Sequence, residues 1–370
     1  MAGGRDRPTG IRVARLEAMV YRVPTERPES DGTFAWEGTT VVVVEATAAD
    51  RRGVGYACTD ASAARLIREW LAPRVVGREA FDVPAIWEDL VASVRNVGRA
   101  GIASSAISAI DVALWDLKAR LLGLPLVRLL GARREQVACY ASGGFTSETP
   151  AELHAGAEAW LRRGFRAVKM KVGREPEGDL ARVRLVRRAL GSGPALYVDA
   201  NGAYDRKQAL LLADGFAELG VTWLEEPVSS DDLAGLRFVR ERTRLAVAAG
   251  EYGTDARYHR GLLEAQAVDV LQVDATRCLG LSGFLAAAAL ADVFSIPLSS
   301  HTAPAIHLHA ACAAPRFLTL EYFHDHARLE RFLFDGAVEP VEGSLRPDLE
   351  LPGLGLELKR REAERYSIRG

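Results

Sequence analysis

The stretch AVKMKVGREPEGDLARVRLVRRALGSGPALYVD at residues 167–199 contains one complete unit of the repeat that decides the fold. It predicts a buried strand that ends at Lys171, an amphipathic helix, and a second buried strand that ends at Asp199. A strand followed by a helix and another strand is the unit from which parallel sheets are built.

Short apolar runs continue this unit along the chain, and each of them ends on a polar side chain. These runs are VTWLEE at 221–226, LAVAAGE at 245–251, VLQVD at 270–274, IPLSSH at 296–301 and FLTLE at 317–321. Their polar ends are about 20 to 28 residues apart, which is room for one strand, one helix and two loops. We count eight strands and at least seven helices from Val137 onward. The pattern predicts a β/α barrel with these polar groups at one mouth.

An open, doubly wound sheet is the alternative arrangement. It predicts a glycine-rich phosphate turn after its first strand, and the turn here is ASGGFTS at 141–147, which does not match GxGxxG. The barrel is therefore favoured.

The chain divides into three segments. A length of 370 residues suggests about two domains. Strands at 11–23 and 39–47, a loop at 24–38, and helices at about 61–71, 82–95 and 103–122 predict an α+β domain over residues 1–132. The barrel occupies 133–335. Residues 336–370 leave the alternating pattern, and we expect them to return to the first domain.

The composition excludes several classes of protein. A net charge of −2 offers no basic field for nucleic acid or a membrane surface. The four cysteines are widely separated and form no CxxC pair, so we expect no zinc module and mostly buried thiols in a reducing compartment. No apolar run is long enough to span a membrane, and residues 1–10 lack a signal sequence, so we expect a cytoplasmic protein.

Three acids end three consecutive predicted strands: Asp199, Glu225 and Glu251. One acid at a strand end is ordinarily part of a solvated rim. Three that converge repel one another unless a cation neutralises them, and hard oxygen ligands select Mg²⁺, with Mn²⁺ as the alternative. The sequence predicts a metal site.

Two lysines, Lys169 and Lys171, are two residues apart on a strand and therefore point to the same side. Each could merely pair with a carboxylate. Two adjacent ammonium groups lower each other's pKa, however, so Lys171, at the strand end, is the candidate base. Lys169 would tune it and contact a substrate carboxylate.

Asp274 and His301 end strands that face the lysines across the barrel. An Asp beside a His fixes the imidazole tautomer and supports its protonated form.

Glu321, on the last strand, either donates a hydrogen bond to a substrate carboxylate when it is protonated or pairs with a lysine. We expect His307 and His309 to be packing residues. A base, a divalent cation and an acid together fit removal of a proton α to a carboxylate.

With these motifs the chain resembles the enolase superfamily, in particular the mandelate racemase branch of the mandelate racemase/muconate lactonizing enzyme family. The motifs that carry the resemblance are AIDVALWDLKARLLGLPLVRLLG at 109–131, KMK at 169–171, DANG at 199–202, EEP at 225–227, GE at 250–251, the Asp274/His301 pair and Glu321. The resemblance implies a modified TIM barrel, (β/α)₇β, with an α+β N-terminal capping domain completed by the C-terminal tail.

The resemblance also implies the roles of the site residues. It makes Asp199, Glu225 and Glu251 ligands of one Mg²⁺ per subunit, Lys171 and His301 two acid/base groups, and Glu321 a partner of the substrate carboxylate. Asn201 matches a position near the metal. A symmetric homo-oligomer is implied as well.

The resemblance places substrate specificity in two cap loops, here at about 24–38 and 55–63. The candidate substrate-binding residues are Arg27, Trp36 and Asp60 in these loops and His324 after the last strand, and Trp36 could equally be cap packing. We expect an acid-sugar dehydratase that gives a 2-keto-3-deoxy acid. The alternatives are a racemase or epimerase of a mandelate-type hydroxy acid, and a metal- and carboxylate-binding module without turnover.

Overall fold

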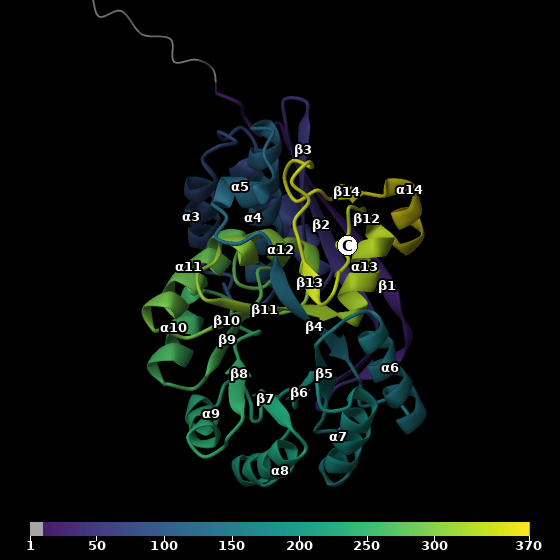
Figure 1. Ribbon diagram of the computed structural model, residues 1–370. Helices are drawn as coiled ribbons and strands as arrows, with labels where there is room; N and C mark the ends of the chain where they lie inside the picture. Colours follow the sequence, from purple (N-terminus) through teal and green to yellow (C-terminus); the bar gives the residue numbers. More distant parts are fainter. Residues whose placement is uncertain (1–9, 370) are drawn as a thin grey trace, which may run out of the picture.

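The computed structural model describes residues 10–369, which form a capping domain above a barrel (Figure 1). The cap begins with an antiparallel sheet of three strands in the order β1 (Arg15–Ser30), β2 (Ala35–Ala48) and β3 (Arg51–Cys58). Its helices are α1 (Ser62–Leu66), the π-helical turn η1 (Ile67–Leu71), α2 (Ala72–Val75), α3 (Val83–Ser93), α4 (Ile102–Leu121) and α5 (Leu126–Leu130). The three helical segments expected in the cap are confirmed, and the short α5 is an addition.

The prediction of a loop over residues 24–38 was wrong. Strands β1 and β2 continue through most of it as a hairpin, with one register shift between Pro24 and Glu29, and only residues 31–34 form the turn. The prolines misled the prediction, but β1 is an edge strand, where proline is tolerated. The prediction of a loop over residues 55–63 was also wrong for its first four residues, because β3 continues to Cys58.

Two glycines of β3 let this strand lie directly on α4. A Cβ atom at Gly53 would lie 2.2 Å from the carbonyl oxygen of Ala113, and one at Gly55 would lie 2.3 Å from that of Ala109. No real Cβ atom approaches a carbonyl oxygen so closely, so glycine at both positions brings the strand and the helix into contact.

The barrel consists of eight parallel strands, closed by pairing of the last with the first. The strands are β4 (Val137–Gly143), β5 (Ala167–Lys171), β6 (Ala195–Asp199), β7 (Val221–Glu225), β8 (Ala246–Ala249), β9 (Val270–Val273), β10 (Leu298–Ser300) and β11 (Phe317–Phe323). The helices between them are α6 (Pro150–Arg162), α7 (Pro176–Leu190), α8 (Arg206–Glu218), α9 (Leu233–Arg240), α10 (Ala256–Glu264), α11 (Gly280–Val293) and α12 (Pro304–Ala313), and α13 (His324–Leu333) follows β11. The predicted (β/α)₇β barrel is confirmed.

The C-terminal segment returns to the cap, as expected (Figure 1, yellow). It contains β13 (Ser344–Leu345), β14 (Glu357–Leu358), α14 (Arg360–Ala363) and the short turn η2 (Glu364–Tyr366), and β14 pairs with β12 (Phe334–Asp335), which immediately precedes the segment. Its backbone joins the first domain, since the N–H of Leu126 donates to the carbonyl of Gly353 at 2.7 Å and that of Ile368 donates to Val20 at 3.0 Å. The domain boundaries after residues 132 and 335 stay predictions.

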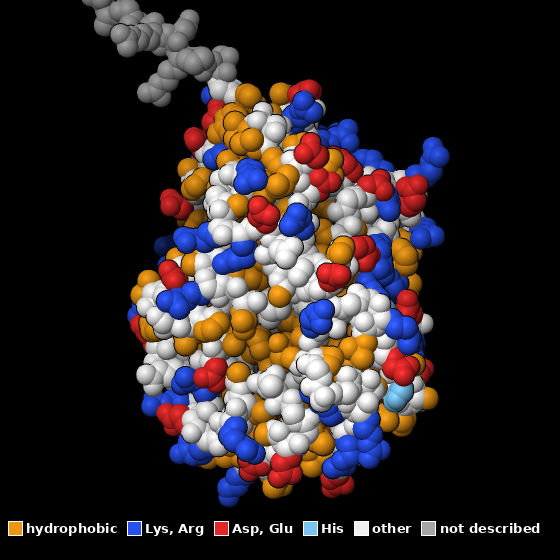
Figure 2. All heavy atoms as spheres, in the orientation of Figure 1, with side chains coloured by type: hydrophobic (Ala, Val, Ile, Leu, Met, Phe, Trp, Pro, Cys, Tyr) orange, Lys and Arg blue, Asp and Glu red, His pale blue; other side chains and the backbone are white. Residues whose placement is uncertain are grey.

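The surface carries charges of both signs. On the face in Figure 2, Lys and Arg side chains are interspersed with Asp and Glu side chains. The cysteines Cys139, Cys278 and Cys312 are buried free thiols. Among residues 10–369 there is no helix that combines the length and the apolar character needed to cross a membrane.

Candidate active site

Three buried carboxylates meet at the mouth of the barrel. Asp199 ends β6, Glu225 ends β7, and Glu251 follows β8 after one glycine. The strand register sets Asp199 beside Glu225, and one ligand oxygen from each of the three acids lies within 4.8 Å of the others. Gly250 has a φ of 133°, and a Cβ there would lie 2.3 Å from the carbonyl of Gln272, so only glycine permits the turn that leads into Glu251.

The chemistry of this carboxylate cluster fits a hard divalent cation. All three acids are oxygen donors, they are at most 3% exposed, and Glu251 Oε2 is buried without a hydrogen-bond partner. Close buried carboxylates repel one another, and a cation such as Mg²⁺ relieves that repulsion.

The two lysines point into the barrel, as predicted, and both contact acids. Lys169 forms ion pairs with Glu225, with Glu321 at 2.9 Å and with Asp199 at 3.5 Å, and Lys171 Nζ lies 2.5 Å from Asp199 Oδ2. The expectation that the pKa of Lys171 is lowered was wrong for this arrangement. Burial and the charge of Lys169 lower the pKa of Lys171, but the nearby carboxylates, led by Asp199, outweigh them and raise it.

The Asp–His pair forms as predicted on the far side of the barrel. His301 Nδ1 lies 2.8 Å from Asp274 Oδ2, and the N–H of Thr276 donates to Asp274 Oδ1 at 2.6 Å. Burial disfavours ionisation of Asp274, but the hydrogen bond and charge of His301 outweigh it and lower the pKa of Asp274. With Nδ1 engaged, His301 directs Nε2 toward the carboxylate cluster, where it lies 3.4 Å from Glu251 Oε2.

Glu321 takes the second of its two predicted arrangements. It pairs with Lys169 and accepts a hydrogen bond from the N–H of Thr302 at 2.8 Å. Burial opposes ionisation, but the charges of Lys169 and His301 lower the pKa of Glu321, so the expectation of a protonated donor is not met in this arrangement.

Asn201 lies beside the carboxylate cluster. Its N–H donates to Asp199 Oδ1 at 2.9 Å, its φ is 46°, and its own Oδ1 is buried without a partner. His307 and His309 are buried packing residues of α12, as predicted, and accept hydrogen bonds from the backbone N–H of Ala275 and Val127.

Two residues of the site were not singled out from the sequence. Arg277 lies between the carboxylate cluster and the Asp274–His301 pair. Its Nη1 lies 3.5 Å from Glu251 Oε1, and its Nε lies 3.5 Å from Asp274 Oδ2. Glu226, directly after a predicted ligand, is buried with a φ of 40° and has an unpartnered Oε1. The position of Arg277 three residues after Asp274, in the turn before α11, was the available signal for its contact with Asp274.

The candidate substrate residues outside the carboxylate cluster lie in different surroundings. Arg27 is exposed and forms an ion pair with Glu152 of α6. The Trp36 indole N–H donates to Glu29 at 3.1 Å, and its ring packs on Phe145 with centroids 5.6 Å apart. Trp36 therefore packs against other residues, which was the predicted alternative to substrate binding.

The other two candidates also have local partners. His324 Nε2 lies 3.4 Å from Glu26 Oε2, next to Arg27 at the same edge of the cap. Asp60 is exposed and accepts a hydrogen bond from the N–H of Ser62, within its own turn.

Comparison with protein families covers nearly the whole chain. Residues 15–131 match the mandelate racemase/muconate lactonizing enzyme N-terminal domain, and residues 152–363 match the enolase C-terminal domain-like family. The chain belongs to the mandelate racemase/muconate lactonizing enzyme family of the enolase superfamily.

Among curated members of this family, the L-talarate/galactarate dehydratase of Salmonella typhimurium is 33% identical over 328 residues, which are 85% of this chain and 82% of that protein. A family member from Rubrobacter xylanophilus has a crystal structure with 50% identity and a TM-score of 0.95, over 96% of this chain and 100% of that one.

A third relative was solved with magnesium. This racemase from Streptomyces coelicolor is 29% identical, with a TM-score of 0.91 over 96% of this chain and 100% of its own. The cofactor of the present protein is Mg²⁺, and its carboxylate cluster offers the oxygen donors for it. Family membership supports an enzyme rather than a binding module.

Proposed function

We propose that this protein removes the proton α to the carboxylate of an acid sugar and eliminates water from the β position to give a 2-keto-3-deoxy acid. The observation that carries the proposal is the placement of Lys171 and the His301–Asp274 pair on opposite sides of the carboxylate cluster. The similarity to a sugar-acid dehydratase supports it.

In this proposal Asp199, Glu225 and Glu251 hold the cation. When bound, Mg²⁺ neutralises the carboxylate cluster and stabilises the negative charge that develops on the substrate carboxylate during proton removal. Lys169 and Glu321, which are already in contact at 2.9 Å, border the place for that carboxylate, and Asn201 lies beside it.

The chemical step needs a base and an acid on opposite faces of the substrate. The α C–H bond breaks with its proton going to Nζ of Lys171, which accepts it as the neutral amine. The charge of Lys169 favours that neutral form, and the raising effect of Asp199 on the pKa of Lys171 would be reduced with the cation held by this carboxylate. The β C–O bond then breaks with a proton from Nε2 of His301, whose Nδ1 is held by Asp274 at 2.8 Å. The resulting enol becomes the 2-keto acid.

A racemase is the second candidate, because the relative solved with magnesium is a racemase. Without a β leaving group, protonation of the enediolate by the group on the opposite face inverts the α carbon. The same pair of residues would serve, with Lys171 and His301 exchanging roles as base and acid.

The test is incubation of the Mg²⁺-loaded protein in deuterated water with a panel of acid sugars and α-hydroxy acids. We expect 2-keto acid formation from an acid sugar. His301→Asn should abolish dehydration but permit α-proton exchange by Lys171 on a substrate of suitable configuration. His154→Asn, on the outer part of α6 with an ion pair to Glu158 at 4.0 Å, is the matched control and should change nothing.

Three results would count against the dehydratase proposal. Exchange without net product would favour the racemase. Loss of exchange for every substrate in His301→Asn would contradict the division of roles between the two residues. No exchange with any α-hydroxy acid would refute the proposed function altogether.

A further inference from the structure

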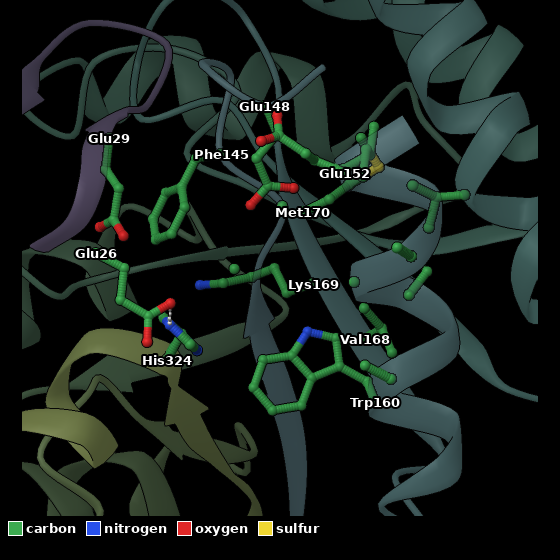
Figure 3. A pocket seen from close by; sticks show the side chains of 18 of the residues that line it. Glu26, Glu29, Phe145, Glu148, Glu152, Trp160, Val168, Lys169, Met170 and His324 are labelled. Atoms are coloured by element: carbon green, nitrogen blue, oxygen red, sulfur yellow. Dashed lines mark ion pairs between the residues drawn. The ribbon is translucent and has the colours of Figure 1, made fainter. Parts of the chain in front are cut away.

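A cavity of about 370 Å³ between the β1–β2 hairpin and α6 lies on the outside of the barrel wall (Figure 3). Its lining includes Val168 and Met170, which alternate with Lys169 along β5 and therefore face away from the barrel interior. The amino group of Lys169 pairs with Glu225 and Glu321 on the inner side. The cavity is thus separate from the carboxylate cluster, and an arrangement that does bear on the candidate active site lies across the barrel, around β9 and β10.

One buried histidine of α12 connects the two turns that carry the Asp–His pair. His307 Nε2 accepts a hydrogen bond from the N–H of Ala275, the residue after Asp274, at 2.8 Å. Its Nδ1 lies 2.9 Å from the carbonyl oxygen of Thr302, the residue after His301. Burial lowers the pKa of His307, so the ring is neutral. Because Nε2 accepts, the single ring proton is on Nδ1, which donates to Thr302. His307 therefore bridges the two turns.

The backbone between β10 and α12 is strained and needs such support. Thr302 has a φ of 49° and Ala303 a φ of 41°, and a left-handed backbone is a clear outlier for a β-branched threonine. Strain of this kind persists only where the surrounding contacts hold it, and it is concentrated at functional sites. The N–H of Thr302 donates to Glu321 at 2.8 Å. The N–H of Ala303 donates to His326 Nδ1 at 3.3 Å, and His307 holds the carbonyl side of the turn.

The second histidine of α12 shows what a packing position alone requires. His309 is also buried, and burial lowers its pKa to about 4. Its Nδ1 accepts a hydrogen bond from the N–H of Val127 at 3.1 Å. Val127 belongs to α5, so this histidine connects α12 to the cap rather than to the turns. His307 and His309 therefore differ in their partners and not in burial or charge.

We propose that His307 is a positioning residue, which fixes the turns after Asp274 and His301 relative to each other so that Nε2 of His301 faces the leaving hydroxyl of the substrate. This inference rests on the proposed function. His307 is fully buried behind the two turns and acts through their backbone.

The position of the bridge explains why it should matter for one step of the reaction. The paired register of β9 and β10 ends at Val273 and Ser300, and His307 continues the connection beyond the strands. A displacement of about 1 Å of a catalytic group can cost about a hundredfold in rate. Elimination needs His301 in place, whereas removal of the α proton by Lys171 takes place from β5 on the other side of the barrel.

The experiment follows an acid sugar in deuterated water with the Mg²⁺-loaded protein. Keto acid measures elimination, and deuterium at the α carbon of the recovered substrate measures proton removal without elimination. In His307→Leu we expect the ratio of deuterium incorporation to keto acid to rise by about tenfold or more, with a lower kcat and a nearly unchanged KM. A general loss of folded protein or of Mg²⁺ would lower both products in proportion and leave the ratio unchanged.

Three further variants control for packing and for reach. His309→Leu makes the same substitution two residues along α12 and should leave the ratio unchanged. His307→Asn keeps a polar group in the buried position, but its shorter side chain cannot span both turns, so the ratio should rise. The longer amide of His307→Gln offers one acceptor and a donor, and should return the ratio to within about threefold of the wild type.

The outcomes separate this inference from the proposed function. An unchanged ratio in both His307→Leu and His307→Asn would overturn the inference and leave the proposed function intact. An equal rise in His309→Leu, or a ratio in His307→Gln as high as in His307→Leu, would also overturn it. No keto acid and no exchange in the wild type with any acid sugar would refute both.

Discussion

A buried carboxyl group, Glu330 of α13, should make the stability of the protein depend on pH. Its Oε1 accepts hydrogen bonds from the Tyr56 hydroxyl of the cap and from the N–H of Ala305 at 3.0 Å, at the start of α12. Its Oε2 is buried without a partner. This arrangement suits a neutral carboxyl that accepts at one oxygen and carries its proton on the other.

The size of the effect follows from the shift in pKa. Burial raises the pKa of Glu330 from 4.5 to about 7. Because this acid has a higher pKa in the folded protein, its stabilising contribution is present below the unfolded pKa and is lost as the pH rises through the folded value. The full shift corresponds to about 3 kcal/mol, of which about 2.5 kcal/mol falls between about pH 5 and pH 8.

The variant Glu330→Gln keeps both acceptor contacts and cannot ionise. Its free energy of unfolding, measured by urea denaturation with tryptophan fluorescence, should fall less than that of the wild type between about pH 5 and pH 8. The difference between the two slopes isolates this residue from every other titrating group. Glu350→Gln, at an exposed position, serves as the control. Parallel pH profiles for Glu330→Gln and the wild type would refute the reasoning.

Three further predictions concern the candidate active site and the cap. Glu225→Gln should weaken Mg²⁺ binding by about tenfold or more in calorimetric titrations, and unchanged affinity would contradict its assignment as a ligand. Asp274→Asn should lower the rate of dehydration by about a thousandfold, because His301 loses the acceptor at Nδ1, with Mg²⁺ affinity retained. Asp116→Ala should lower the free energy of unfolding by about 3 kcal/mol, because two backbone N–H groups and Arg120 lose their buried partner. If the free energy of unfolding of Asp116→Ala fell by less than about 0.5 kcal/mol, water would have replaced the Asp116 carboxylate as the hydrogen-bond acceptor.

The barrel and the convergence of the candidate site residues were predictable because the signal repeats. The polar residues from Lys171 to Glu321 follow apolar runs at an even spacing, and parallel strands in register must bring such positions to one end of the sheet. Periodicity therefore predicted both the order of the strands and the convergence of their last residues.

The cap was harder because its geometry depends on contacts between distant segments. The strand β3 contains Gly53 and Gly55, which lower strand propensity, yet the surface of α4 requires them there. The protonation states of Lys171 and Glu321 depend on distances between side chains of several strands, which spacing along the chain does not provide. The contact of Arg277 with Glu251 was missed for the same reason, since these two residues follow different strands.

The return of residues 353–368 to the cap has a consequence for folding during synthesis. Asp116 receives the N–H of Leu354, and β1 receives that of Ile368, only after every barrel strand has left the ribosome. Until then the first domain lacks these partners, and Oδ1 of the Asp116 carboxylate has not received its hydrogen bond from Leu354. All eight strands of the barrel are therefore available for pairing before the residues that complete the cap have been synthesised.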